Sequence, residues 1–264
     1  MISDYAAVNG VSLYFERRGS GPAMLFIPGG GVDASHFAQV AELLADEFTI
    51  VTYDRRGYFR SRRPEDGTTI AEQADDVAGL LEALDLAPAI VWGGSLGGVI
   101  LLDLISRRAD LVATAIVHEP PLFSVLPQGE AMAAEITRQA RSGDARKAME
   151  EHASQALRDV FSRLTPGHRE RLIANGEPFF GLDVPALTAY QLDAAALART
   201  SVPVAVVAGA EGPLRGTSQW VADQVGTHVH DLAGGHMPYA VEPQATAQLL
   251  RRLSAGSQPS RQLR

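Results

Sequence analysis

The chain has 264 residues, and 46% of them are apolar, which is ample for one large core. Its net charge of −8 and isoelectric point of about 5.4 argue against nucleic acid or an anionic membrane as a partner. It contains no cysteine, which excludes disulfides, a thiol nucleophile and cysteine-based metal sites.

In chain order, the first predicted element is a hairpin in which residues 6–8 turn at Asn9-Gly10 into residues 11–15. Continuous apolar runs, typical of strands buried on both faces, follow at residues 23–27, 48–53, 89–93, 112–117 and 202–208. A shorter strand is expected at residues 227–232. Helical patterns lie between the strands, at residues 35–46, 70–84, 99–106, 219–225 and 243–253.

This alternation predicts an α/β fold with a mostly parallel central sheet and helices on both faces. Residues 125–199 contain helical patterns without a buried-strand run, so we expect an inserted helical cap over the carboxyl ends of the strands. Residues 1–124 and 200–254 would form one core domain, and residues 255–264 a disordered tail. The amino terminus has no signal-peptide pattern, and no apolar stretch approaches membrane-spanning length. We therefore expect a cytoplasmic protein without a membrane partner, and leave a homodimer open.

The stretch Gly93-Gly94-Ser95-Leu96-Gly97 has the form G-x-S-x-G, between a predicted strand and a predicted helix. A serine on such a tight turn is held exposed above the sheet edge, and the glycines allow close backbone approach. A glycine-rich turn alone would need only flexibility, but the strand and helix around it favour Ser95 as a nucleophile.

A serine nucleophile needs a base and an oxyanion site. His236 lies in Gly234-Gly235-His236-Met237-Pro238-Tyr239, after the last strand, where the flanking glycines would let its ring approach Ser95. The backbone N–H of Leu96 should be one oxyanion donor. The second should come from Pro28-Gly29-Gly30-Gly31, with Gly30 favoured.

The base in turn needs a carboxylate that fixes its tautomer. Glu119 follows the strand next after the Ser95 helix, so its side chain should reach His236. Glu211, after the strand at residues 202–208, is the alternative, and a site without a carboxylate partner also stays open. His118 precedes Glu119, and strand alternation predicts that it faces away from His236.

The chain resembles the α/β-hydrolase superfamily and, within it, the zearalenone lactonases. The segments that carry the resemblance are Gly19-Ser20-Gly21-Pro22, Ile27-Pro28-Gly29-Gly30, Val91-Trp92-Gly93-Gly94-Ser95, His118-Glu119-Pro120-Pro121 and Gly235-His236-Met237-Pro238-Tyr239. The resemblance implies Ser95 as nucleophile, Glu119 as acid and His236 as base, with Gly30 and Leu96 as oxyanion donors. In most of the superfamily the acid falls at the position of Gly212, which here has no side chain. Gly29 replaces an acidic residue of the lactonases, and residues 125–199 contain no tryptophan where those enzymes use one, so the resemblance supports the triad and not the substrate.

We expect a serine hydrolase that cleaves a carboxylic ester or lactone and needs no cofactor or metal. A carbon–carbon hydrolase, an acyltransferase or a perhydrolase with the same triad is the alternative, and a non-catalytic small-molecule receptor is the alternative of another class. The arginine-rich loop at residues 54–63 is interpreted as structural and not as an anion site. The expected lining of the substrate pocket is His36, Phe123, Phe179, Phe180, Tyr190 and Met237.

Overall fold

The computed structural model describes residues 1–141, 143–210, 212 and 214–255, and within these residues eight strands form one sheet. The order across the sheet is β1-β2-β4-β3-β5-β6-β7-β8. β1 pairs antiparallel with β2 and β2 with β4, whereas all other pairs are parallel, so the expected mostly parallel sheet is confirmed. The strands are β1 (Ile2–Val8), β2 (Val11–Arg18), β3 (Ala23–Ile27), β4 (Thr49–Tyr53), β5 (Ala89–Gly94), β6 (Val112–His118), β7 (Val204–Ala208) and β8 (Val229–Asp231).

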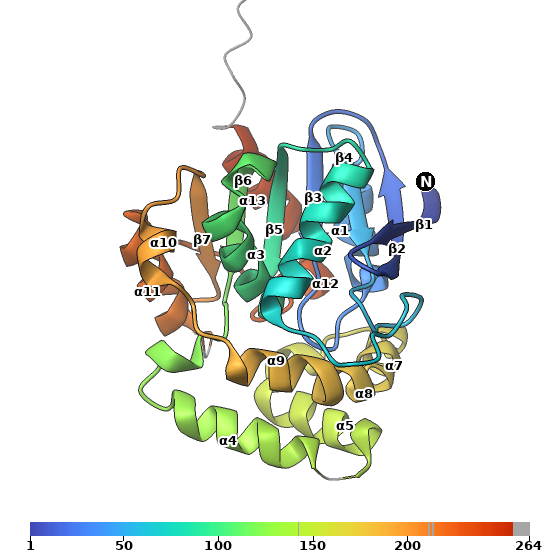
Figure 1. Cartoon of the computed structure of the whole chain (residues 1–264), viewed down its shortest axis with the longest axis vertical. Coiled ribbons are helices and arrows are strands. Elements are labelled where there is room, and N and C mark those ends of the chain that lie inside the picture. The colour runs from blue at the N-terminus through green and yellow to red at the C-terminus, as the bar shows by residue number, and fades with distance from the viewer. Residues whose placement is uncertain (142, 211, 213, 256–264) are drawn as a thin grey trace, which may run out of the picture.

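Helices cover both faces of the sheet, as Figure 1 shows. Leu25 and Val91 belong to one core cluster, and their neighbours Met24 and Ile90 to the other, because successive side chains of a strand point to opposite faces. The first cluster is closed by α2 (Ile70–Ala83), α3 (Leu96–Arg107), α10 (Ala194–Ala198) and α11 (Arg215–Val225). The second is closed by α1 (Ala38–Leu44), α12 (Pro238–Val241) and α13 (Pro243–Ala255).

Most predicted elements are present with shifted ends. The helix expected at residues 35–46 is α1 preceded by a 3-10 turn, η1 (Ala34–Phe37). α11 begins at Arg215 and not at residue 219, because its first turn buries the polar side chains of Thr217 and Ser218, which hide the apolar periodicity. The strand expected at residues 227–232 pairs only over β8.

Between β6 and β7 the described residues form helices and no strand. In Figure 1 the helices α4, α5, α7, α8 and α9 of this segment form a separate layer below the sheet. The segment comprises η3 (Phe123–Val125), α4 (Gly129–Ala140), α5 (Ala145–Ala156), α6 (Arg158–Phe161), α7 (Pro166–Ala174), α8 (Gly176–Pro178), the π-helix η4 (Phe179–Asp183), α9 (Val184–Ala189) and α10. At the other end of the chain, Ala255 closes α13, and the rest of the expected tail, residues 256–264, lies outside the described residues.

In the part of the chain that the structure describes, no helix has the length and apolar character needed to cross a bilayer. A 3-10 turn, η2 (Ala109–Leu111), joins α3 to β6 and completes the elements of the core.

Candidate active site

Ser95 stands on a strained turn between β5 and α3. Its backbone has φ +54° and ψ −127°, a region that residues with a Cβ rarely occupy. The turn is held by a hydrogen bond from the Ser95 N–H to the His118 carbonyl at 2.8 Å. It also needs glycine at positions 93 and 97, because a Cβ on Gly93 would lie 2.3 Å from the Gly97 oxygen and one on Gly97 2.3 Å from the Ile27 oxygen. The sequence thus builds a turn that presents Ser95 at the carboxyl edge of the sheet.

Glu119 and His236 meet at the same edge, 117 positions apart in the chain. Glu119 follows β6 with φ +44°, and its Oε2 accepts a hydrogen bond from His236 Nδ1 at 2.6 Å. Its Oε1 accepts one from the Gly209 N–H at 2.9 Å. Burial alone would raise the pKa of the Glu119 carboxyl, but the hydrogen bond and charge of His236 outweigh burial and lower that pKa to about 2. The Glu119 carboxylate is therefore ionised and accepts a hydrogen bond from the Nδ1–H of the His236 imidazole.

The position of the Glu119 carboxylate accounts for the glycine at position 212. A Cβ built on Gly212 would lie 2.0 Å from Glu119 Oε1 and 2.9 Å from its Cδ. The carboxylate therefore fills the space that a side chain at position 212 would need. Glu211, the other candidate acid, lies outside the described residues.

The loop after β3 passes close to Ser95. A Cβ on Gly29 would lie 3.1 Å from Ser95 Cβ, so the loop backbone borders the serine directly. The Gly31 N–H donates to the Tyr58 hydroxyl at 3.1 Å and is therefore not available to a ligand, whereas Gly30 stays the candidate donor of this loop. Leu96 is the first residue of α3, where backbone N–H groups have no partner within the helix.

A cavity of about 630 Å³ opens at this edge. Its floor contains Gly30, Ser95, Leu96 and His236, and its walls and roof include Phe123, Phe179 and Met237. The aromatic wall meets the floor closely, since a Cβ on Gly30 would lie 2.5 Å from Phe179 Cε2. The cavity thus brings the serine, the histidine and both candidate N–H groups to one space.

Three residues expected in this pocket do not line it, and for them the prediction is wrong. His36 is fully buried between the Asp33 side chain and the His168 carbonyl, which lies 3.2 Å from its Nε2. Phe180 packs edge-on behind Phe179, with ring centroids 4.9 Å apart. Tyr190 donates its hydroxyl hydrogen to Asp103 of α3 at 3.0 Å.

Two polar residues near the site were not singled out from the sequence. His152 and Asp183, from the helical segment, line the cavity. His118 is fully buried, with its ring centroid 5.4 Å from Trp92 and 6.1 Å from His236. It therefore lies behind His236, contrary to the expected alternation, because Glu119 has left the strand conformation. The described residues contain no cluster of three or more His, Asp or Glu side chains that could hold a metal ion.

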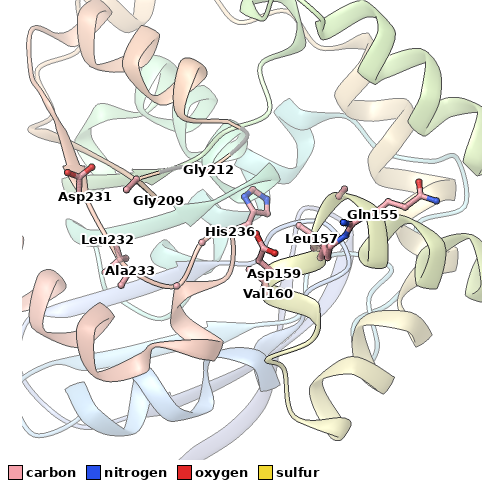
Figure 2. Close-up of a pocket in the computed structure, with 15 residues that line it drawn as sticks. Gln155, Leu157, Asp159, Val160, Gly209, Gly212, Asp231, Leu232, Ala233 and His236 are labelled. Atoms are coloured by element: carbon pink, nitrogen blue, oxygen red, sulfur yellow. The ribbon is translucent and has the colours of Figure 1, made fainter.

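A second cavity, of about 790 Å³, lies on the other side of His236. Figure 2 shows His236 between Gly209 and Gly212 on one side and Leu157 and Gln155 on the other. His236 is shared by both cavities, together with residues 155–157 at the end of α5. The His236 imidazole therefore borders both cavities.

Comparisons with known proteins show the family to which the chain belongs. The sequence profile described as "Alpha/beta hydrolase family" matches residues 24–249. The uncharacterized hydrolase YraK of Bacillus subtilis (strain 168) is 32% identical over 249 residues, covering 89% of this chain and 89% of that protein. Zearalenone hydrolase of Bionectria ochroleuca is 33% identical over 124 residues, 45% of this chain and 47% of that protein. A hydrolase from Pseudomonas aeruginosa PA01 has the same fold, with a TM-score of 0.83 at 22% identity over 95% of this chain and 97% of that one. The chain therefore belongs to the alpha/beta hydrolase family.

Proposed function

We propose that this chain is a serine hydrolase that cleaves a carboxylic ester or lactone through an acyl-enzyme intermediate. The observation that carries the proposal is the cavity in which Ser95, on its strained turn, and His236, held by the buried Glu119, face one space. A nucleophile, a base and an orienting carboxylate in this order are the parts that acyl transfer needs.

In the proposed reaction His236 Nε2 takes the Ser95 hydroxyl proton while Oγ attacks the carbonyl carbon. The carbonyl oxygen becomes an oxyanion, which the N–H groups of Gly30 and Leu96 stabilise. The tetrahedral intermediate collapses, the bond to the alkoxy oxygen breaks, and His236 protonates the leaving alcohol. His236 then takes a proton from water, and the hydroxide attacks the acyl carbon to form a second tetrahedral intermediate. When this collapses, the bond to Ser95 Oγ breaks, His236 returns its proton to Oγ, and the carboxylic acid leaves.

Glu119 supports each proton transfer without itself being protonated. Its carboxylate holds the Nδ1–H, so that Nε2 is the atom free to accept the serine proton. It also stabilises the imidazolium that forms, because the pair is buried and the attraction is weakly screened.

We propose that residues 125–199 act as a cap on a core formed by residues 1–124 and 200–254. Phe179 and His152 of this segment contribute to the cavity opposite Ser95. The partner that suits a cavity of this size, largely lined by apolar side chains, is an uncharged small molecule, in agreement with an ester or lactone.

The test is covalent trapping together with turnover. The purified chain should hydrolyse short para-nitrophenyl esters and should be modified by a fluorophosphonate, with the added mass on the peptide that contains Ser95. Label on another residue, or turnover that survives Ser95→Ala, would contradict the proposal. Turnover of vinylogous diketones but of no ester or lactone would favour a carbon–carbon hydrolase, and ligand binding without turnover or labelling would favour a receptor.

Gly212→Ala should lower kcat by about 10²-fold, because a displaced catalytic group commonly costs about this much. The new methyl group would occupy the place of Glu119 Oε1 and would push the carboxylate away from His236. Steady-state kinetics on a para-nitrophenyl ester would measure the effect. Gly216→Ala is the matched control, since the nearest atom to its new Cβ lies 3.6 Å away, an ordinary contact. Equal kcat values for the two variants would show that the Glu119 carboxylate is not needed where it lies.

A further inference from the structure

The roof of the Ser95 cavity contains a histidine whose protonation pattern is fixed by its neighbours. His152, on α5, lines the cavity, and its ring centroid lies 5.3 Å from that of Phe179. Its Nδ1 lies 3.0 Å from Gln139 Oε1, on the neighbouring helix α4. No other described residue makes a hydrogen bond to the ring, so Nε2 is available to a molecule bound in the cavity.

A chain of hydrogen bonds determines which nitrogen of His152 carries the proton. Arg138 donates to both carboxylate oxygens of Glu135, at 2.8 and 2.6 Å, so Glu135 is ionised and can only accept. Glu135 Oε1 therefore accepts from the Gln139 amide nitrogen, at 3.0 Å. The remaining atom of that amide is its oxygen, which also can only accept, and His152 Nδ1 must be the donor to it.

The second nitrogen of the ring is consequently an acceptor at neutral pH. Burial, followed by the charge of His236, lowers the pKa of His152 to about 4, so the ring is uncharged. A neutral imidazole protonated at Nδ1 presents a bare lone pair at Nε2. In a largely apolar cavity such an acceptor is costly to leave without a donor.

We propose that His152 Nε2 accepts a hydrogen bond from a hydroxyl group of the substrate, so that the substrate is an ester or lactone carrying a free alcohol or phenol. The inference rests on the proposed function, of which it specifies the substrate class. A cationic amine fits less well as the donor. The two carboxylates among the described lining residues are already paired, Glu135 with Arg138 and Asp183 with Arg55.

The test compares matched esters that differ only in a hydroxyl group. Para-nitrophenyl esters of graded acyl length, each ending in either a hydroxyl or a methyl group, would be assayed with the parent chain and with His152→Phe. In the parent, kcat/KM should be about 10-fold higher for the hydroxylated ester of at least one pair, the gain expected of one well-placed hydrogen bond. In His152→Phe, which keeps an aromatic ring against Phe179, this ratio should fall to about 1. Gln139→Leu removes the acceptor that fixes the tautomer, and should lower the ratio about 3-fold.

Because each result is a ratio within a pair, a general loss of activity in a variant cancels. His228→Phe, a change of an exposed histidine remote from the cavity, is the control and should keep the parental ratio. A ratio near 1 for every pair in the parent, or an unchanged ratio in His152→Phe, would overturn the inference while ester turnover leaves the proposed function intact. If no ester is turned over, the proposed function fails separately. In that case the affinities of Ser95→Ala for the corresponding amides, which end in either a hydroxyl or a methyl group, would be measured by calorimetry. Binding about 10-fold tighter for the hydroxylated amide would support the role of His152, and equal affinities would overturn it.

Discussion

Replacement of Glu119 by glutamine is expected to lower kcat for ester hydrolysis by about 10³- to 10⁴-fold, the loss seen when the carboxylate of a Ser-His-Asp triad becomes an amide. The amide keeps the shape of the side chain but has a neutral oxygen, or an N–H group, where His236 Nδ1 now meets Oε2 at 2.6 Å. The imidazolium loses its counter-charge, and the opposite tautomer becomes accessible. Steady-state kinetics on a para-nitrophenyl ester, with circular dichroism to verify folding, would measure the effect.

Glu211→Gln is the matched control, and it also tests the alternative that Glu211 is the triad acid. It makes the same chemical change at the other candidate acid, and should leave kcat within about two-fold, because the Glu119 carboxylate already accepts the hydrogen bond from His236 Nδ1. Ser95→Ala gives the residual rate without the nucleophile, with which the rates of both variants are compared. The reverse order, with Glu211→Gln inactive and Glu119→Gln active, would show that Glu211 and not Glu119 is the triad acid.

Much of this arrangement can be predicted from the sequence because the determinants are local. Buried parallel strands are continuous apolar runs, and the residues that follow them stand at one edge of the sheet for topological reasons. This reasoning predicts Ser95 and His236 as site residues, each on a loop with glycines that allow a close approach. Glu119 was favoured because its strand follows the helix that starts at Ser95, and its carboxylate does lie against the His236 ring.

The cavity lining could not be predicted in the same way, because periodicity shows which residues are apolar and not which space they face. Phe179 and Phe180 are adjacent and equally apolar, yet only Phe179 reaches the cavity. The register of the π-helix that carries them decides this, and the sequence has no local signal for it. The partner of His36 Nε2 is the remote His168 carbonyl, and this contact depends on how the helical segment docks.

Long-range polar pairs were missed for the same reason. Arg55 was interpreted within a structural arginine-rich loop, whereas its partner Asp183 is 128 positions away. The available signal was the placement of Arg55 directly after a buried strand, where an unpaired charge would be costly. That signal predicts that a partner exists but cannot say which carboxylate it is.

The Asp183 carboxylate joins the helical segment to the core, and its removal should be the most destabilising change outside the apolar core. Both oxygens accept from Arg55, each at 2.7 Å, and Oδ2 also accepts from the Tyr58 hydroxyl. Burial lowers the pKa of Arg55, but the attraction of Asp183 outweighs burial and raises it, so the guanidinium stays charged. Arg55 also donates to the Gly29 carbonyl at 2.9 Å, and the Tyr58 hydroxyl accepts from the Gly31 N–H. The same cluster therefore holds the loop that carries Gly30, the proposed oxyanion donor.

Asp183→Ala should lower the free energy of unfolding by about 3–5 kcal/mol, because it leaves the Arg55 charge buried without a partner. Urea unfolding followed by circular dichroism would measure this. Glu177→Ala is the matched control, since the Glu177–Arg63 ion pair joins the same two segments at the surface, with 62% and 45% of the side chains exposed. Its loss should cost less than about 1 kcal/mol. Equal losses in the two variants would mean that water reaches Arg55 once Asp183 is gone, and that the segments are held together by their apolar contacts and not by the buried ion pair.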